Sequence, residues 1–312
     1  MPDSREDLII QGFSWDTPDI LRGDDAAEFK VPHAHCVVSQ DTLCEDVHFD
    51  LSFCRPTDIA HRVIHANLSD MAAMGLYGQY VLQSLAIPKL LSGEWLTQYT
   101  QAFNHILAEN QLHLIGGDTC LSRHGVTITL TIMTYAPPHQ TISRHRAKPG
   151  DIIAISKLPG QAMLGLNALK RQAGFEQFHD FFLKPQADNH LATLLKSTGT
   201  LHAMIDTSDG LYQDLQRLSQ CSQVGIEIDI DQIPCTDEFI TACKTMHLDP
   251  VQLQLTGGED YGLLFAADPS ILSFQNQYHF YPIGHVTDTQ SIQFIKGGQD
   301  FQLEDLGYTH FD

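Results

Sequence analysis

The chain has 312 residues, of which 43% are hydrophobic and 18% are charged, values typical of a folded globular protein and not of a disordered or fibrous one. This length favours two domains. An excess of 38 Asp and Glu over 18 Lys and Arg gives a formal net charge of −20, which disfavours nucleic acid and anionic membranes as partners.

The first residues, MPDSREDLII, lack the basic stretch followed by an apolar stretch that marks a secretory signal. No apolar run approaches the roughly 20 residues needed to span a bilayer. The seven cysteines are odd in number and show no CxxC spacing, so we interpret them as reduced thiols. We therefore expect a cytoplasmic protein without a membrane partner.

Apolar periodicity predicts the elements of the first half in chain order: strand 35–39, helix 57–74, strand 80–87, helix 93–109, strand 112–115 and strand 126–134. The last strand is the clearest, because Val126, Ile128 and Leu130 alternate with threonines. The double proline that follows it is the best boundary candidate. We therefore expect one domain over 1–138 and another over 139–312.

In the second half the same patterns predict strand 151–156, helices 161–173 and 187–197, a helix ending near 221, strand 225–230, helix 235–247, and strands 261–267 and 279–283. Strands and helices are mixed throughout, but no regular strand–helix–strand rhythm repeats. The predicted fold class is therefore mixed α/β and α+β, and not a doubly wound sheet.

The most informative feature is that acidic residues sit in short turns punctuated by Gly, Ser or Thr. These segments are 22–27, 39–43, 67–70, 115–119, 205–210 and 256–261. Carboxylates that converge on one place repel each other unless divalent cations lie between them. No GxxxxGK[ST] loop and no GxGxxG motif is present. We interpret the pattern as a Mg²⁺-dependent phosphoryl-transfer enzyme in which metal supplies the positive charge that so acidic a chain lacks.

The first-half candidates for metal ligands are oxygen donors. Asp25 lies in a glycine turn, while Ser39, Gln40 and Asp41 close a predicted strand with a hydroxyl, a carbonyl and a carboxylate. Asp70 lies inside an otherwise apolar helix, where a carboxylate must be paired, hydrogen-bonded or metal-bound. The alternatives are a plain surface turn at Asp25 and a backbone-capping side chain at Asp70.

Further candidates follow glycines or precede a helix. Gly117 allows close backbone approach to a phosphate, and Asp118 after it can take a metal. Asp206 and Asp209 bracket Ser208 ahead of a helix, where capping is the alternative role.

Two residues are candidates for contacting a substrate. Glu259 follows a Gly-Gly pair before a strand, and with its neighbour Asp260 it can accept hydrogen bonds from a cationic or amine-bearing substrate. A polar turn is the alternative. His48 follows Asp41 closely along the chain, and a structural role is its alternative.

Taken in order, these motifs carry a resemblance. They are GDDAA (23–27), SQDTLxExVHF (39–49), NLSDMAAMG (67–75), GGDT (116–119), AKPGD (147–151), IDTSDGL (205–211) and GGEDYGLLF (257–265). The series closely resembles the bacterial thiamine-monophosphate kinase family, part of the superfamily of aminoimidazole ribonucleotide synthetase and selenophosphate synthetase. The match runs from about residue 5 to the final GYTHF.

The resemblance implies a two-domain, aminoimidazole ribonucleotide synthetase-like fold. Its N-terminal α/β domain would pair its sheet with that of a second subunit in a homodimer, and an α+β domain would follow. The implied reaction transfers the γ-phosphoryl of ATP to thiamine monophosphate, with several Mg²⁺ ions bound. The acceptor phosphate is already ionised at neutral pH, so no catalytic side chain is needed as a general base.

The resemblance also implies a set of site residues. Metal ligands fall on Asp25, Ser39, Gln40, Asp41, Asp70, Asp118, Asp206 and Asp209; nucleotide contacts on Gly117, Asp118, Arg144 and Ser208; substrate contacts on His48, Glu259 and Tyr308. Arg144 would face the nucleotide phosphates. Glu259 and the ring of Tyr308 would suit a cationic thiazolium.

The chain departs from the family pattern at four places. Gln40 stands where Thr is common, and Asp46 replaces a glycine. Asp188 stands where an Arg is usual, and Ser156-Lys157 replaces a Thr-Gly turn. Two alternatives stay open: an aminoimidazole ribonucleotide synthetase-type enzyme, or a divergent protein that binds nucleotide and divalent cation with little activity.

Overall fold

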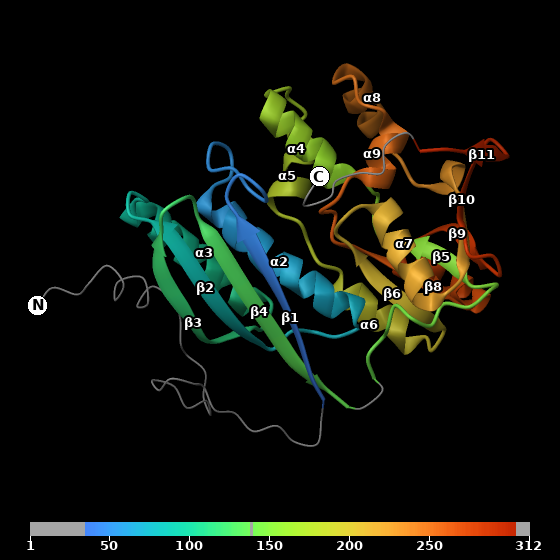
Figure 1. Ribbon diagram of the computed structural model, residues 1–312, viewed down its shortest axis with the longest axis horizontal. Helices are drawn as coiled ribbons and strands as arrows, with labels where there is room; N and C mark the ends of the chain where they lie inside the picture. Colours follow the sequence, from blue (N-terminus) through green and yellow to red (C-terminus); the bar gives the residue numbers. More distant parts are fainter. Residues whose placement is uncertain (1–34, 138–139, 304–312) are drawn as a thin grey trace, which may run out of the picture. The chain divides into compact units, whose positions relative to one another are not determined.

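The computed structural model describes residues 35–137 and 140–303, which form two compact units. The first contains Tyr77–Gln140 and the described residues up to Met71. The second contains Ala72–Leu76 and the described residues from Thr141 onwards. Each unit combines a sheet with helices, so the expected two-part mixed α/β class is confirmed (Figure 1). No helix in the described ranges is long and apolar enough to cross a membrane.

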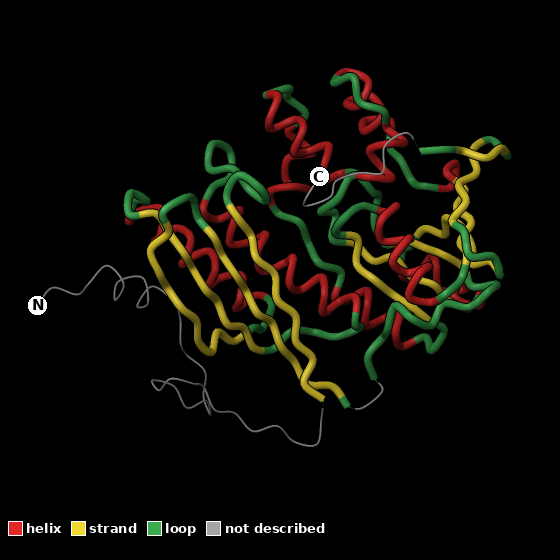
Figure 2. The backbone as a smooth tube through the Cα atoms, viewed as in Figure 1, coloured by secondary structure: helices red, strands yellow, loops and turns green. Residues whose placement is uncertain are grey.

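The first unit is built on a four-stranded sheet with the order β1-β4-β2-β3. Its strands are β1 (His35–Cys44), β2 (Tyr80–Pro88), β3 (His113–Ser122) and β4 (Thr127–Ala136). β4 is antiparallel to both β1 and β2, whereas β3 runs parallel to β2. Helices α2 (Pro56–Ala73) and α3 (Gly93–Glu109) lie along one face of this sheet (Figure 2).

The predicted alternation of β4 decides which face is covered. Ile128, Leu130 and Ile132 are fully buried beneath the helices, and the intervening threonines point to the other face. On the covered face the hydroxyl of Tyr99 in α3 donates to Oε1 of Gln83 in β2 at 3.0 Å. Both side chains are buried, so this polar pair is satisfied within the core.

The second unit is built on a seven-stranded sheet with the order β11-β10-β7-β9-β5-β8-β6. The strands are β5 (Ile152–Ile155), β6 (Leu201–Thr207), β7 (Gly225–Asp229), β8 (Gly262–Ala267), β9 (Tyr281–Thr287), β10 (Ile292–Lys296) and β11 (Gln299–Phe301). The α-helices are α4 (Gln161–Arg171), α5 (His179–Leu183), α6 (Asn189–Ser197), α7 (Leu211–Ser222), α8 (Asp237–Thr245), α9 (Pro250–Thr256) and α10 (Gln275–Tyr278).

This second sheet is buried on both faces. Along β5, Ile153 and Ile155 enter the cluster that contains Leu215 of α7, whereas Ala154 enters the cluster that contains Leu195 of α6. Successive strand residues point to opposite faces, so α7 and α6 cover different sides of the sheet. Two-sided burial explains why these strands read as apolar runs without alternation.

Several predicted boundaries were wrong, for physical reasons. β1 continues to Cys44 and β3 to Ser122, well beyond the predicted ends. In both strands the hydrogen-bond ladder with the neighbouring strand, β4 for β1 and β2 for β3, continues after the apolar pattern has stopped. β6 was not predicted at all, because its short sequence LHAMIDT runs into the acidic turn at 205–210.

A glycine on β3 gives a test of this packing. A Cβ built on Gly117 would lie 1.9 Å from the carbonyl oxygen of Gln83, which belongs to the backbone of β2 and cannot move aside. We expect Gly117→Ala to destabilise the first unit by about 3 kcal/mol or more. The matched control is Gly93→Ala in the first turn of α3, where a Cβ meets nothing within 4 Å. Thermal denaturation compares the Gly117→Ala and Gly93→Ala variants. Equal melting temperatures would contradict the close contact between β3 and β2.

Candidate active site

In the first unit the structure brings together three of the predicted metal ligands. Ser39 and Asp41 lie on β1 opposite Ile132 and Leu130, so they share the face covered by α2. The hydroxyl of Ser39 donates to Oδ2 of Asp70 on that helix. One helical turn earlier, Oδ1 of Asn67 accepts the backbone N–H of Asp41 at 3.3 Å. The middle of β1 is therefore tied to α2 through polar side chains.

Gln40 points the other way. Its Oε1 accepts the hydroxyl of Thr131 at 2.7 Å on the sheet face opposite the helices. A metal bound beside Ser39 and Asp70 would therefore take the backbone carbonyl of Gln40 and not its side chain. The Gln that stands where Thr is common thus places its side chain on the face opposite Asp70.

Asp118 also lies apart from Ser39 and Asp70, on the other face of the sheet. The strand register places it beside Ser84, in a row that continues to Thr129 and Thr42. This row alternates with the row of Asp41, so it belongs to the face opposite α2 and α3. Asp118 is exposed, and its Oδ1 accepts the N–H of Thr119 at 2.9 Å. Within this unit the predicted metal ligands thus divide between the two faces of one sheet.

In the second unit two glycine-containing turns dock against each other. The N–H of Glu259 donates to the carbonyl of Ser208 at 2.8 Å, and the N–H of Tyr261 donates to that of Thr207 at 2.9 Å. A Cβ on Gly258 would lie 2.6 Å from the carbonyl oxygen of Ser208. Docking therefore requires glycine, and it brings the predicted nucleotide contact Ser208 next to the predicted substrate contact Glu259.

The backbone is strained at this docked turn. Glu259 has φ +67° and Tyr261 has φ +48°, both in the left-handed region that favours glycine. Such conformations cost about 1–3 kcal/mol each and persist where surrounding contacts enforce them, often at functional sites. The strain supports a functional role for the residues that the turn presents.

Asp206 and Asp209 lie beside a further carboxylate that the motif search missed. Asp214 on α7 is 0% exposed, and no hydrogen-bond partner for its Oδ2 lies in the described part of the chain. Burial first, and then the neighbouring Asp206 and Asp209, raise the pKa of Asp214 well above its usual range. The guanidinium of Arg217 offsets this charge, contacting Oδ2 of Asp209 and lying 3.4 Å from Oδ1 of Asp214.

A signal for Asp214 was present in the sequence. Leu211, Leu215 and Leu218 are buried at helical spacing on α7, and Asp214 occupies the same stripe. A carboxylate in an apolar stripe needs a partner, by the reasoning that selected Asp70.

The donor atoms suit a hard divalent cation, because they are carboxylate, hydroxyl and carbonyl oxygens. Among the residues that the structure describes, however, no group of three or more His, Cys, Asp or Glu is arranged to hold a metal ion. The donors instead form smaller groups, one in each unit. The guanidinium of Arg217 contacts Oδ2 of Asp209, so a metal that bound this oxygen would have to displace the arginine.

The remaining predicted residues are placed as follows. Asp25 and Tyr308 lie outside the described residues. Arg144 is exposed, and its carbonyl accepts the hydroxyl of Ser222 at 2.8 Å, which fixes its backbone. Nδ1 of His48 accepts the N–H of Cys44 at 3.1 Å, and the carbonyl of His48 accepts Nη2 of Arg62 at 3.0 Å. His48 is thus held in place by its own neighbourhood.

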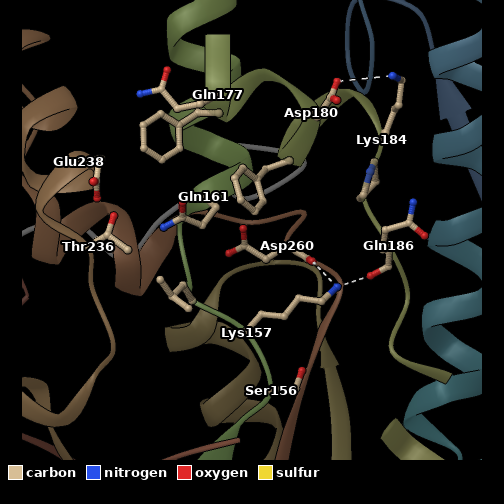
Figure 3. A pocket seen from close by; sticks show the side chains of 14 residues that line it. Ser156, Lys157, Gln161, Gln177, Asp180, Lys184, Gln186, Thr236, Glu238 and Asp260 are labelled. Atoms are coloured by element: carbon tan, nitrogen blue, oxygen red, sulfur yellow. Dashed lines mark hydrogen bonds and ion pairs between the residues drawn. The ribbon is translucent and has the colours of Figure 1, made fainter. Parts of the chain in front are cut away.

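A pocket of about 730 Å³ lies within the second unit (Figure 3). Phe178, Phe181, Leu158 and Pro185 make much of its lining apolar, and Glu238 lies at its edge. The turn before β8 contributes Asp260, so the pocket borders the docked turns.

Asp260 has a structural role that its sequence position did not suggest. Its carboxylate accepts the N–H groups of Gly160 at 2.6 Å and Ala162 at 2.9 Å, at the N-terminus of α4. It therefore caps a helix whose own cap residue, Gly160, has no side chain. Burial raises the pKa of Asp260 to about 7, and the hydrogen bonds from α4 oppose this rise.

Two of the departures from the family pattern contact each other beside this pocket. Nζ of Lys157 lies 3.7 Å from Oδ1 of Asp188, and the hydroxyl of Ser156 donates to the other carboxylate oxygen. Lys157 also donates to the carbonyls of Gln186 and Tyr261, the latter at 3.0 Å. Burial lowers the pKa of Lys157, and Asp188 opposes that shift. This pair joins three chain segments around the pocket.

Comparison with known proteins defines the class first. Residues 23–136 match the AIR synthase related protein N-terminal domain, and residues 148–297 match the corresponding C-terminal domain. A thiamine-monophosphate kinase from Haemophilus influenzae is 32% identical over 260 residues, covering 81% of this chain and 77% of that protein.

Solved structures agree with this class. The thiamine-monophosphate kinase from Stenotrophomonas maltophilia K279a has a TM-score of 0.80 at 28% identity, covering 92% of this chain and 94% of that chain. AaThiL complexed with AMPPCP and TMP has a TM-score of 0.81 at 25% identity, covering 98% and 95%. The chain belongs to the thiamine-monophosphate kinase family of enzymes.

The Lys157–Asp188 contact predicts a measurable coupling. The side chains are only 27% and 21% exposed, so we expect a coupling free energy of about 1 kcal/mol between Lys157→Met and Asp188→Asn. Denaturation of the wild type, both single variants and the double variant measures it. The control is the more exposed pair Lys184 and Asp180, 3.6 Å apart on adjacent turns, for which we expect a few tenths of a kcal/mol. Equal coupling free energies in both cycles would show that the Lys157–Asp188 contact adds no more stability than an exposed ion pair.

Proposed function

We propose that this chain phosphorylates thiamine monophosphate to thiamine diphosphate, using ATP as co-substrate and Mg²⁺ for direct in-line transfer. The observation that carries the proposal is the docking of the 205–211 turn against the 256–261 turn. It brings Ser208, expected at the nucleotide, beside Glu259, expected at the acceptor. Support also comes from the similarity of the whole chain to AaThiL, whose structure contains AMPPCP and TMP.

The chemistry requires positioning and charge neutralisation. The acceptor is a phosphate monoester that already carries negative charge at neutral pH, so its oxygen attacks without a strong general base. Ser39, Asp41 and Asp70 in one unit, with Asp206 and Asp209 in the other, are the residues that would hold Mg²⁺. Bound there, Mg²⁺ supplies the positive charge that offsets the phosphates of donor and acceptor.

The remaining contacts follow from charge. The exposed guanidinium of Arg144 would bind nucleotide phosphates, and Gly117 and Asp118 of the first unit are the other expected nucleotide contacts. In the second unit Glu259 would face the cationic thiazolium. His48 in the first unit and Tyr308, which lies outside the described range, are the other expected substrate contacts. This assignment gives the two ends of the acceptor different partners, metal at the phosphate and a carboxylate at the ring.

We further propose a cytoplasmic homodimer formed through the face of the first sheet that lies opposite α2 and α3. Val38 is 59% exposed on that face, and the rings of Tyr80 and Tyr135 meet there with centroids 6.2 Å apart. No helix in the described ranges packs against it, so a second sheet can. Molar mass from light scattering tests this, and a monomer at micromolar concentration would refute it.

A divergent protein that binds nucleotide without turnover is the second candidate. The contact of Arg217 with Asp209 favours it, because this arginine competes with metal for the carboxylate. The first experiment is therefore thiamine diphosphate formation from thiamine monophosphate, ATP and Mg²⁺. Free thiamine and the aminoimidazole-pathway substrate serve as controls. Product from the monophosphate alone supports the kinase, whereas Mg-ATP binding without product favours the second candidate.

Removing one charge from either acidic group should stop turnover without unfolding the protein. We expect Asp70→Asn and Asp209→Asn each to lower kcat at least ~100-fold, because each weakens metal binding. Circular dichroism and the melting temperature without metal should stay close to wild type, because relief of carboxylate repulsion offsets the lost contacts. The control is Asp288→Asn in an exposed turn. Near-normal activity in either site variant would remove that residue from the metal set.

A further inference from the structure

We propose that Arg217 is an exchangeable counter-ion, which transfers its guanidinium from Asp209 to Asp214 when Asp209 binds a divalent cation. Asp214 is then a positioning residue, because it acts on the metal site through Arg217. The inference rests on the proposed function, in which Asp206 and Asp209 hold Mg²⁺, and it adds two residues of α7 to that site.

One nitrogen of the arginine lies between the two carboxylates. Nη1 of Arg217 contacts Oδ2 of Asp209 and lies 3.4 Å from Oδ1 of Asp214. The second distance exceeds the roughly 2.7–3.2 Å of an ordinary N–H···O hydrogen bond by only a few tenths of an ångström. Asp209 and Asp214 therefore compete for the same nitrogen, and a small rotation of the Arg217 side chain converts one contact into the other.

Asp214 has an oxygen atom to offer the guanidinium. Its side chain is 0% exposed, and its Oδ2 has no hydrogen-bond partner in the described part of the chain. A buried polar oxygen without a partner carries its full desolvation penalty. A guanidinium that binds both carboxylate oxygens through two parallel N–H groups, as Arg commonly does, would remove this penalty. Both contacts of Arg217 use Nη1, so neither engages Nη2.

The arginine can move, whereas Asp214 cannot. The side chain of Arg217 is 42% exposed, and it lies on α7 one helical turn after Asp214. Asp214 lies in the buried stripe between Leu211 and Leu218. Its carboxylate also accepts the backbone N–H of Asp209. Asp214 is therefore a fixed point that holds the backbone of Asp209 and lies within reach of Arg217.

Charge sets the direction of the exchange. Burial lowers the pKa of Arg217, but the hydrogen bond and charge of Asp209, with the charges of Asp214 and Asp206, raise it overall. A divalent cation at Asp209 would neutralise that carboxylate and repel the guanidinium at short range. Because Asp206 would hold the same cation, Asp214 is the member of the group that is left for Arg217.

The exchange makes Arg217 a part of the metal site and not only a barrier to it. An arginine fixed on Asp209 would exclude the cation, as in the second candidate function. With Asp214 as an alternative partner, the displaced guanidinium is bound again one helical turn away. The affinity of Asp209 for a cation then depends on Asp214 through Arg217.

A double-mutant cycle of Arg217→Gln and Asp214→Asn tests the exchange. Mn²⁺ is the probe, because the electron paramagnetic resonance signal of the free ion reports its concentration directly. Arg217→Gln should lower the Mn²⁺ Kd about 5-fold, because the competitor for Asp209 is gone. Asp214→Asn should raise the Kd about 10-fold while Arg217 is present, because the arginine then stays on Asp209, but less than about 3-fold in the Arg217→Gln background.

Two further variants are controls. Asp209→Asn identifies the Mn²⁺ binding that belongs to this group, and unchanged binding in that variant would overturn the proposal. Lys170→Gln removes an exposed cation from the last turn of α4 and should keep the wild-type Kd. An equal fold-change for Asp214→Asn in both backgrounds would also overturn the exchange, since Asp214 would then act by its own charge or as a ligand.

Melting temperatures give a second measurement, which needs only Arg217→Gln and does not depend on whether Asp214→Asn folds. The rise in melting temperature on adding Mn²⁺ should be larger in Arg217→Gln than in wild type, because no arginine has to be displaced. An equal or smaller rise would overturn the exchange.

These measurements contain no thiamine monophosphate, so they are separate from the kinase assay. Equal effects of Asp214→Asn in both backgrounds, in a protein that makes thiamine diphosphate, would reject the exchange alone. Unequal effects of the predicted size, in a protein that makes none, would support the exchange and reject the kinase.

Discussion

The second unit depends on the docking of two turns, 205–211 and 256–261, through backbone hydrogen bonds that glycines make possible. If either Gly210 or Gly258 carried a Cβ, that atom would lie within 3.0 Å of the opposing backbone. Docking has three consequences: Glu259 lies next to Ser208, Asp260 reaches the N-terminus of α4, and Tyr261 offers its carbonyl to Lys157. The docked turns thus position the residues that we assign to nucleotide and acceptor, together with Asp260 at the pocket.

The same docking concentrates negative charge, which the fold must tolerate before any ligand arrives. Asp214 is buried near Asp206 and Asp209, and the one guanidinium that contacts this group within the described residues belongs to Arg217. Arg217 offsets part of this negative charge through its contact with Asp209, and in the proposed function it would compete with Mg²⁺ for that carboxylate. Under the proposed function, the affinity for Mg²⁺ would be lower than the carboxylates alone would give, which would suit an ion that arrives together with nucleotide phosphates.

The sequence alone predicted an element correctly where local apolar periodicity determined that element. Helix 93–109 was predicted with the bounds that the structure has, and the alternation of β4 identified its buried face. The sequence was insufficient where a long-range contact decided. β6 is a strand because β8 pairs with it, and Asp260 caps α4 from a position about 100 residues away. The division of Gln40 and Asp118 from Asp70 likewise follows from strand register, which motif order does not contain.

The structure also explains departures from the family pattern that are hard to interpret from the sequence alone. Taken singly along the chain, Asp188 in place of an arginine and Lys157 in place of a glycine each suggest a weakened enzyme. In the structure they form an ion pair, and Ser156 and the carbonyl of Tyr261 complete the contact. At either position a lone charge that is only partly exposed would be unfavourable, so each residue offsets the charge of the other. The two changes therefore compensate each other in charge, and their contact joins the segments around the pocket.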